Sequence, residues 1–125
     1  MIRAFPWMLP GAAGALLLAG AATAQHVEVE CVFTTECYEA EPCDDTSFTV
    51  QLGKGDADGQ AILHGPAETI VGDVWGHDAT SLVWIARTQS SVQLISWGAD
   101  GTARYTLHLT DRPAAVTYHG MCEAK

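Results

Sequence analysis

The stretch His26-Val27-Glu28-Val29-Glu30-Cys31-Val32-Phe33 alternates apolar and polar side chains almost throughout. Its odd-numbered residues, from Val27 to Phe33, share one face of an extended segment, and His26, Glu28 and Glu30 share the other. Successive side chains of a β-strand point to opposite faces, so this pattern predicts a strand with one buried face. The alternation continues to the end of the chain with no helical stripe of useful length. The sequence therefore predicts an all-β fold.

Seven further segments read as strands separated by turn-forming residues. They are Phe48–Leu52, Ala61–Leu63, Thr69–Trp75, Ser81–Arg87, Val92–Trp97, Arg104–Leu109 and Ala114–Cys122. About eight short strands at close spacing are typical of a small antiparallel barrel or a two-sheet β-sandwich. We favour the barrel and keep the sandwich as the alternative, because strand spacing does not separate them. The segment from Thr34 to Asp45 is expected to be a loop.

The N-terminus has the three parts of a secretory signal peptide. Arg3 supplies a positive charge, an apolar stretch is densest over residues 12–22, and small residues precede Gln25. We expect residues 1–24 to be a cleaved signal peptide and residues 25–125 to form a single β domain. A retained membrane anchor is the alternative, but two prolines and two glycines interrupt the apolar stretch. Because position 25 is not cysteine, the product is expected to be periplasmic or secreted, with no lipid anchor.

The chain is acidic, with 15 Asp and Glu against 6 Lys and Arg and a net charge of −9. This balance argues against binding to nucleic acid, whose phosphates attract Lys and Arg. It also argues against docking on anionic lipid. A basic protein or a cation is the expected kind of partner. The alternative is that the charge serves solubility alone.

Four cysteines in a small exported chain predict two disulfides. Three pairings are possible, and the even spacing of Cys31, Cys37 and Cys43 does not choose between them. We favour Cys31–Cys122, which would clamp the first strand to the last, with Cys37–Cys43 closing the loop between them. A disulfide joining the first and last strands would also suit a closed barrel.

Two segments are candidate partner-binding sites. The first is the acidic loop, with Glu36, Glu39, Glu41, Asp44 and Asp45. The second is the hairpin around Gly98–Gly101, with Trp97, Asp100 and Arg104. The alternative for the acidic loop is a solvated connection tied by a disulfide.

No pattern indicates catalysis, a cofactor or a metal site. There is no Gly-x-Ser-x-Gly turn, no Cys-x-x-Cys and no metal-binding histidine spacing. His108 and His119 are candidate neighbours on adjacent strands, with two surface histidines as the alternative. Trp75 and Trp97 flank glycine turns, where their rings would either line a barrel mouth or cap the core. We expect the protein not to be an enzyme.

The opening Cys31–Glu39 and the closing Tyr118–Glu123 resemble small, uncharacterised exported proteins of Gram-negative bacteria, which implies the periplasm but no activity. More distantly, the chain resembles periplasmic inhibitors of C-type lysozyme. That family has a small eight-stranded barrel, a cystine joining its two ends and an inhibitory Ser-Gly-Ala-Arg-Tyr-like segment. Gly98–Tyr105 is loosely similar to it, with Asp100 in place of the serine and Thr102 inserted.

The sequence as a whole predicts a non-enzymatic binding module. The alternatives are a lysozyme-inhibitor-like protein that binds a basic hydrolase and a small-ligand carrier with an open barrel.

Overall fold

A computed structural model describes Gly11 and residues 28–78 and 81–125 of the chain. The predicted signal peptide, apart from Gly11, and its cleavage site before Gln25 lie outside these residues. Within the described part, no helix is long and apolar enough to cross a lipid bilayer.

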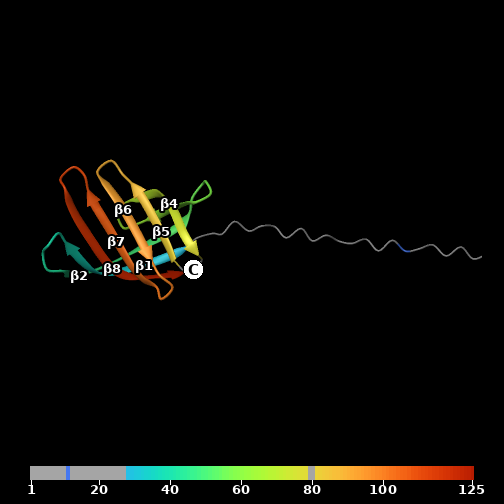
Figure 1. The fold of residues 1–125 in the computed structure, drawn as a ribbon, viewed down its shortest axis with the longest axis horizontal. Coiled ribbons are helices and arrows are strands. Elements are labelled where there is room, and N and C mark those ends of the chain that lie inside the picture. Colours follow the sequence, from blue (N-terminus) through green and yellow to red (C-terminus); the bar gives the residue numbers. More distant parts are fainter. Residues whose placement is uncertain (1–10, 12–27, 79–80) are drawn as a thin grey trace, which may run out of the picture.

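Eight antiparallel strands form one closed barrel in which each strand pairs with its neighbours in the sequence, and β8 returns to pair with β1 (Figure 1). The strands are β1 (Val29–Tyr38), β2 (Asp44–Lys54), β3 (Gln60–His64), β4 (Thr69–Asp78), β5 (Ser81–Arg87), β6 (Ser91–Trp97), β7 (Thr102–Leu109) and β8 (Ala114–Ala124). The predicted all-β barrel is confirmed, and the sandwich alternative is wrong. Closure leaves the sheet without an unpaired edge.

Both predicted disulfides are present. Cys31 on β1 lies directly opposite Cys122 on β8, and the bond between them spans 91 positions of the sequence. It therefore fastens the seam at which the barrel closes. Cys37 is bonded to Cys43, six positions away, across the short β1–β2 connection.

The predicted loop from Thr34 to Asp45 is wrong in its extent. β1 continues to Tyr38 and β2 begins at Asp44, which leaves only residues 39–43 as the connection. A β-bulge between Phe33 and Thr35 shifts the pairing of β1 with both of its neighbours. Such a bulge breaks the simple alternation while the backbone ladder continues, so an extended strand was mistaken for a loop.

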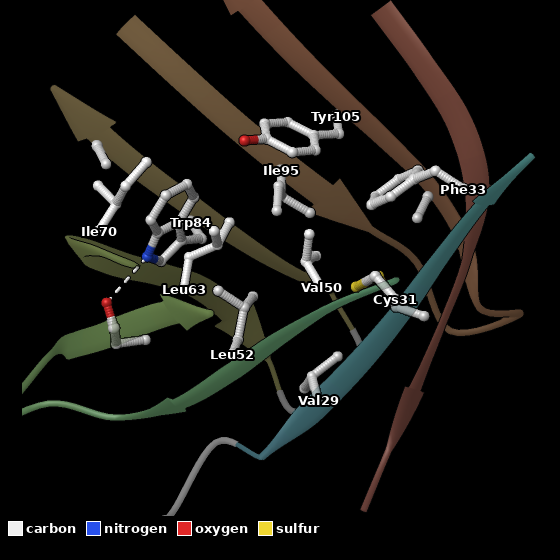
Figure 2. Close-up of a cluster of buried hydrophobic side chains, with 14 residues drawn as sticks. Val29, Cys31, Phe33, Val50, Leu52, Leu63, Ile70, Trp84, Ile95 and Tyr105 are labelled. Carbon is white, nitrogen blue, oxygen red and sulfur yellow. Dashed lines mark hydrogen bonds between the residues drawn. A yellow bond between two sulfur atoms is a disulfide. The ribbon is translucent and has the colours of Figure 1, made fainter. Parts of the chain in front are cut away.

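The barrel interior is filled by apolar side chains from all eight strands (Figure 2). Trp84 is its largest fully buried side chain, and its indole nitrogen donates a hydrogen bond to the Ala61 carbonyl over 3.0 Å. The ring lies against the backbone of Gly72 on β4, where a Cβ atom would come within 2.5 Å of it. Glycine at this position lets β4 approach the tryptophan.

The up-and-down strand order gives the barrel two ends with different loops. The acidic end carries the connections 39–43, 65–68, 88–90 and 110–113. The opposite end carries the connections 55–59 and 98–101. The candidate binding residues divide between these two ends.

Candidate functional site

A pocket of about 230 Å³ opens at the acidic end of the barrel. It lies between the β3–β4 connection and the inner faces of β2, β7 and β8. Its lining consists of Phe48, Val50, Leu63, Gly65, Pro66, Ala67, Glu68, Tyr105, Leu107 and Tyr118. This lining is mostly apolar, as in small-molecule sites, and Glu68 is its charged member.

Aromatic rings form one side of the pocket. The rings of Phe48 and Tyr118 meet edge to face, with centroids 4.7 Å apart and an interplanar angle of 84°. Tyr105 packs against both of these rings, and Phe33, which does not line the pocket, packs against all three. The three lining rings come from β2, β7 and β8, so closure of the barrel is needed to bring them together.

A buried polar network connects the barrel interior to the pocket. The Tyr105 hydroxyl donates a hydrogen bond to the side-chain oxygen of Gln93, which is only 2 % exposed. The Gln93 amide nitrogen in turn donates to Ser91 Oγ over 3.1 Å and to Glu68 Oε1 over 3.3 Å. Ser91 Oγ is hydrogen-bonded to Thr88 Oγ1 over 2.7 Å. The network holds the Glu68 carboxylate at the edge of the pocket.

The Tyr105 hydroxyl is a hydrogen-bond donor in this network. Burial raises its pKa, and the nearby negative charge of Glu68 raises it further. Because deprotonation would place a second negative charge beside Glu68, the hydroxyl stays neutral.

The bulge in β1 places a second carboxylate beside the pocket. Beyond the bulge, Glu36 pairs with Tyr118 on β8 and with Asp44 on β2. Directly opposed residues of an antiparallel pair point to the same face of the sheet. The Glu36 side chain is therefore on the same face as the Tyr118 side chain. Partial burial, followed by the charge and hydrogen bonding of Glu36, raises the pKa of Tyr118 to about 12. Glu36 beside Tyr118 and Glu68 beside the Gln93–Tyr105 hydrogen bond therefore place two carboxyl groups next to the aromatic rings.

The structure separates the two predicted binding segments. Glu36, Glu39, Glu41, Asp44 and Asp45 lie at the acidic end, in the β1–β2 connection and the strand residues next to it. Trp97, Asp100 and Arg104 lie at the opposite end, around the β6–β7 turn. They therefore do not form one site with the acidic segment.

Asp100 and Glu39, which were predicted to bind a partner, make structural hydrogen bonds within the fold. Asp100 accepts a hydrogen bond from the Thr102 backbone nitrogen over 2.9 Å and another from its hydroxyl over 3.0 Å, which lowers the pKa of Asp100 and fixes the turn. Glu39 has a φ of 50° and accepts a hydrogen bond from the Ala115 backbone nitrogen over 2.9 Å. Glu39 thereby ties the acidic connection to β8.

The sequence analysis missed Glu68 and the three aromatic residues of the lining. Glu68 follows the Gly65-Pro66 break without any motif, and Phe48, Tyr105 and Tyr118 look like ordinary inward strand residues. Only the inward positions of the alternation contained a signal, since Tyr105 and Leu107 share one face.

Among the described residues, the tryptophans and histidines singled out in the sequence do not gather at one site. Trp84 is buried in the core, Trp75 is 67 % exposed, and neither lines the pocket. His119 lies opposite Arg104 and His108 opposite Ala115, so the two histidines are not cross-strand partners. In the part of the chain that the structure describes, no group of three His, Cys, Asp or Glu side chains is placed to hold a metal ion.

No family model, curated protein or solved structure matches this chain. The resemblance to exported proteins and to lysozyme inhibitors therefore stays a prediction.

Proposed function

We propose that this protein is a non-enzymatic binding module that recognises a cationic group at the acidic end of its barrel. The observation that carries the proposal is a pocket with aromatic walls whose charged lining residue is an acid, Glu68. A cation over the face of an aromatic ring is attracted by the ring's electrons, and a nearby carboxylate adds to that attraction. Lining of this kind favours an alkylammonium or guanidinium group over a neutral or anionic one.

The size of the pocket supports a single side chain as the occupant. Its volume of about 230 Å³ is below the range of roughly 300–1,000 Å³ that is usual for drug-sized ligands. We therefore place the lysine or arginine side chain of a basic protein in the pocket, in preference to a large carried molecule. A free small amine has the same chemistry and is a separate arm of the test.

The acidic rim of this end of the barrel, formed by Glu41, Asp44 and Asp45, fits a basic protein surface. Glu41, Asp44 and Asp45 are exposed and lie in or beside the connection that the Cys37–Cys43 disulfide closes. Exposed carboxylates of one sign steer an oppositely charged partner and speed its association, and salt weakens that effect. The rim would attract the partner, and the pocket would anchor one of its side chains.

The pocket is tested with small probes in an NMR titration of isotopically labelled protein. n-Butylammonium and n-butylguanidinium should shift the amide resonances of residues 65–68 and the ring resonances of Phe48 and Tyr118, and neutral n-butanol should shift them less. Glu68→Gln should weaken binding of the cations by about 2- to 5-fold, the range of an exposed cation–carboxylate or cation–aromatic contact. Asp58→Asn, at the opposite end, removes the same charge and should have no effect. Equal binding of butanol and butylammonium would contradict a cation site.

The rim is tested separately with a basic protein. A C-type lysozyme is a suitable probe, with binding measured by calorimetry at two salt concentrations and lysozyme turnover followed in parallel. Neutralising Glu41, Asp44 and Asp45 to the matching amides should weaken binding, whereas neutralising Asp56, Asp58 and Glu123 should not. If lysozyme binds but its turnover is unchanged, the proposal that the protein inhibits lysozyme is excluded, and the proposal that it binds a basic protein is kept. Absence of binding to any basic protein, with cations still entering the pocket, would leave a receptor for free small amines.

A further inference from the structure

The outer faces of β4, β5 and β6 form an apolar wall that has no role in the proposed cation binding. These three strands lie side by side in the barrel (Figure 1). Their outward positions carry large apolar side chains with high exposure: Val71 (55 %), Trp75 (67 %), Ile85 (37 %), Val92 (41 %) and Leu94 (36 %). Contiguous exposed apolar surface on a barrel wall is typical of a protein–protein interface.

Among the outward residues of these strands whose side chains the structure describes, two are charged, one of each sign. Asp73 on β4 and Arg87 on β5 are both exposed and stand among the apolar side chains. The chain as a whole has 15 acidic residues against 6 basic ones, so this wall is balanced where the rest of the molecule is strongly acidic. A balanced wall avoids the repulsion that two acidic surfaces would otherwise feel.

The register of β4 and β5 places these charges symmetrically. Asp73 lies directly opposite Ile85. Val71 is two residues before Asp73 on its strand, and Arg87 is two residues after Ile85, so these four outward side chains form the corners of a quadrilateral. The apolar residues occupy one diagonal and the opposite charges occupy the other.

We infer that this wall is the interface of a symmetric homodimer. The two-fold axis would lie in the plane of the interface, along the line from Val71 to Ile85. Val71 of one copy would then meet Val71 of the second copy, and Ile85 would meet Ile85. The same rotation exchanges the ends of the charged diagonal, so Asp73 of each copy meets Arg87 of the other. A two-fold interface requires such self-complementarity, because one patch must serve both partners. Trp75 at the edge of the wall adds the kind of large aromatic contact that dominates many interfaces.

Such a dimer leaves the acidic ends free. The pocket is lined from inside the barrel and from the β3–β4 connection, whereas the wall consists of outward side chains of β4–β6. A dimer would present two cation sites to a partner, and linked sites bind a multivalent partner more tightly than single ones.

The test is sedimentation velocity on protein purified from the periplasm of an expression host, with both disulfides formed. The expected result is a concentration-dependent species of twice the monomer mass. Ile85→Glu should remove it, and Val32→Glu, an equally exposed apolar position on β1, should not. Circular dichroism confirms that each variant is folded.

Charge reversal gives the decisive comparison. Asp73→Arg alone and Arg87→Asp alone should each weaken dimerisation by about tenfold or more, since like charges then face each other twice. The double variant restores opposite charges across the axis and should recover most of the affinity. A monomer at protein concentrations up to about 1 mM would overturn the inference. A dimer that is indifferent to Ile85→Glu and to the charge reversals would overturn it as well, because its interface would lie elsewhere.

Discussion

Replacing Gly72 by alanine should destabilise the barrel far more than the size of a methyl group suggests. A Cβ atom at position 72 would lie 2.5 Å from both Cε2 and Nε1 of Trp84 and 2.6 Å from the Ile85 carbonyl oxygen. Two of these atoms belong to a fully buried indole ring and the third to the backbone of a paired strand. None of them is the free end of a flexible side chain, so the ring or the strand has to move.

The size of the effect follows from what must move. Overpacking of a tight core costs about 1–3 kcal/mol, and displacing the indole also weakens its bond to Ala61, which is worth about 0.5–1.5 kcal/mol. Alanine restricts the unfolded chain more than glycine and returns about 0.5–1 kcal/mol. We expect a net loss of about 0.5–4 kcal/mol, centred at about 2 kcal/mol, and in a domain of about 100 residues each kcal/mol lowers Tm by several degrees.

Gly53→Ala is the matched control, because no atom lies within 4 Å of a Cβ placed at that position. Guanidinium unfolding of both variants, followed by tryptophan fluorescence, measures the difference in free energy of unfolding. Gly53→Ala should be neutral or slightly stabilising. If the two variants have the same stability, close packing of Trp84 on β4 is not what requires glycine at position 72.

Two further predictions concern the cystines and the pocket. Replacing Cys31 and Cys122 together by alanine should lower the free energy of unfolding by about 4–5 kcal/mol, and replacing Cys37 and Cys43 by about 2 kcal/mol, because the first bond closes a much longer loop in the unfolded chain. Denaturant unfolding of both variants checks this order, and the reverse order would contradict the loop-closure reasoning. The free energy of unfolding should also fall as the pH rises from 10.0 to about 12, since the raised pKa of Tyr118 keeps it protonated in the folded state while the unfolded chain ionises. Tyr118→Phe should reduce this fall without removing it, because Tyr105 also has a raised pKa in the folded state, and an unchanged profile would show that Tyr118 ionises equally in both states.

The acidic segment shows where sequence reasoning stopped. Alternation placed Val29, Cys31 and Phe33 on the inner face correctly, and all three are buried. The same alternation predicted that the strand ends at Phe33, because apolar residues no longer occupy every second position after it. The bulge after Phe33 shifts the alternation of inward and outward side chains by one residue. Glu36 is therefore on the same face of the sheet as Tyr118. Pairing of β1 with two other strands stabilises this bulge, so no local pattern in the sequence of β1 alone predicts it.

The candidate site shows the same limit at a longer range. The acidic rim was predicted because five carboxylates are close together in the sequence. The pocket was not, since Phe48, Glu68, Tyr105 and Tyr118 are separated by 20, 37 and 13 positions. Taken one at a time, each of these residues has the pattern of an inward strand residue or of an ordinary turn residue.

By itself, the sequence determined the class of fold, the number of cystines and the acidic character of the chain. Period-two alternation, cysteine number and net charge are local or additive properties, and they do not depend on which strand pairs with which. The tertiary structure alone decided which strand residues meet. Closure of the barrel assembled the aromatic pocket beside Glu68, and the pairing of β4 with β5 set Asp73 and Arg87 on one diagonal of an apolar wall. These groupings depend on strand register, which is fixed by the burial of all eight strands at once.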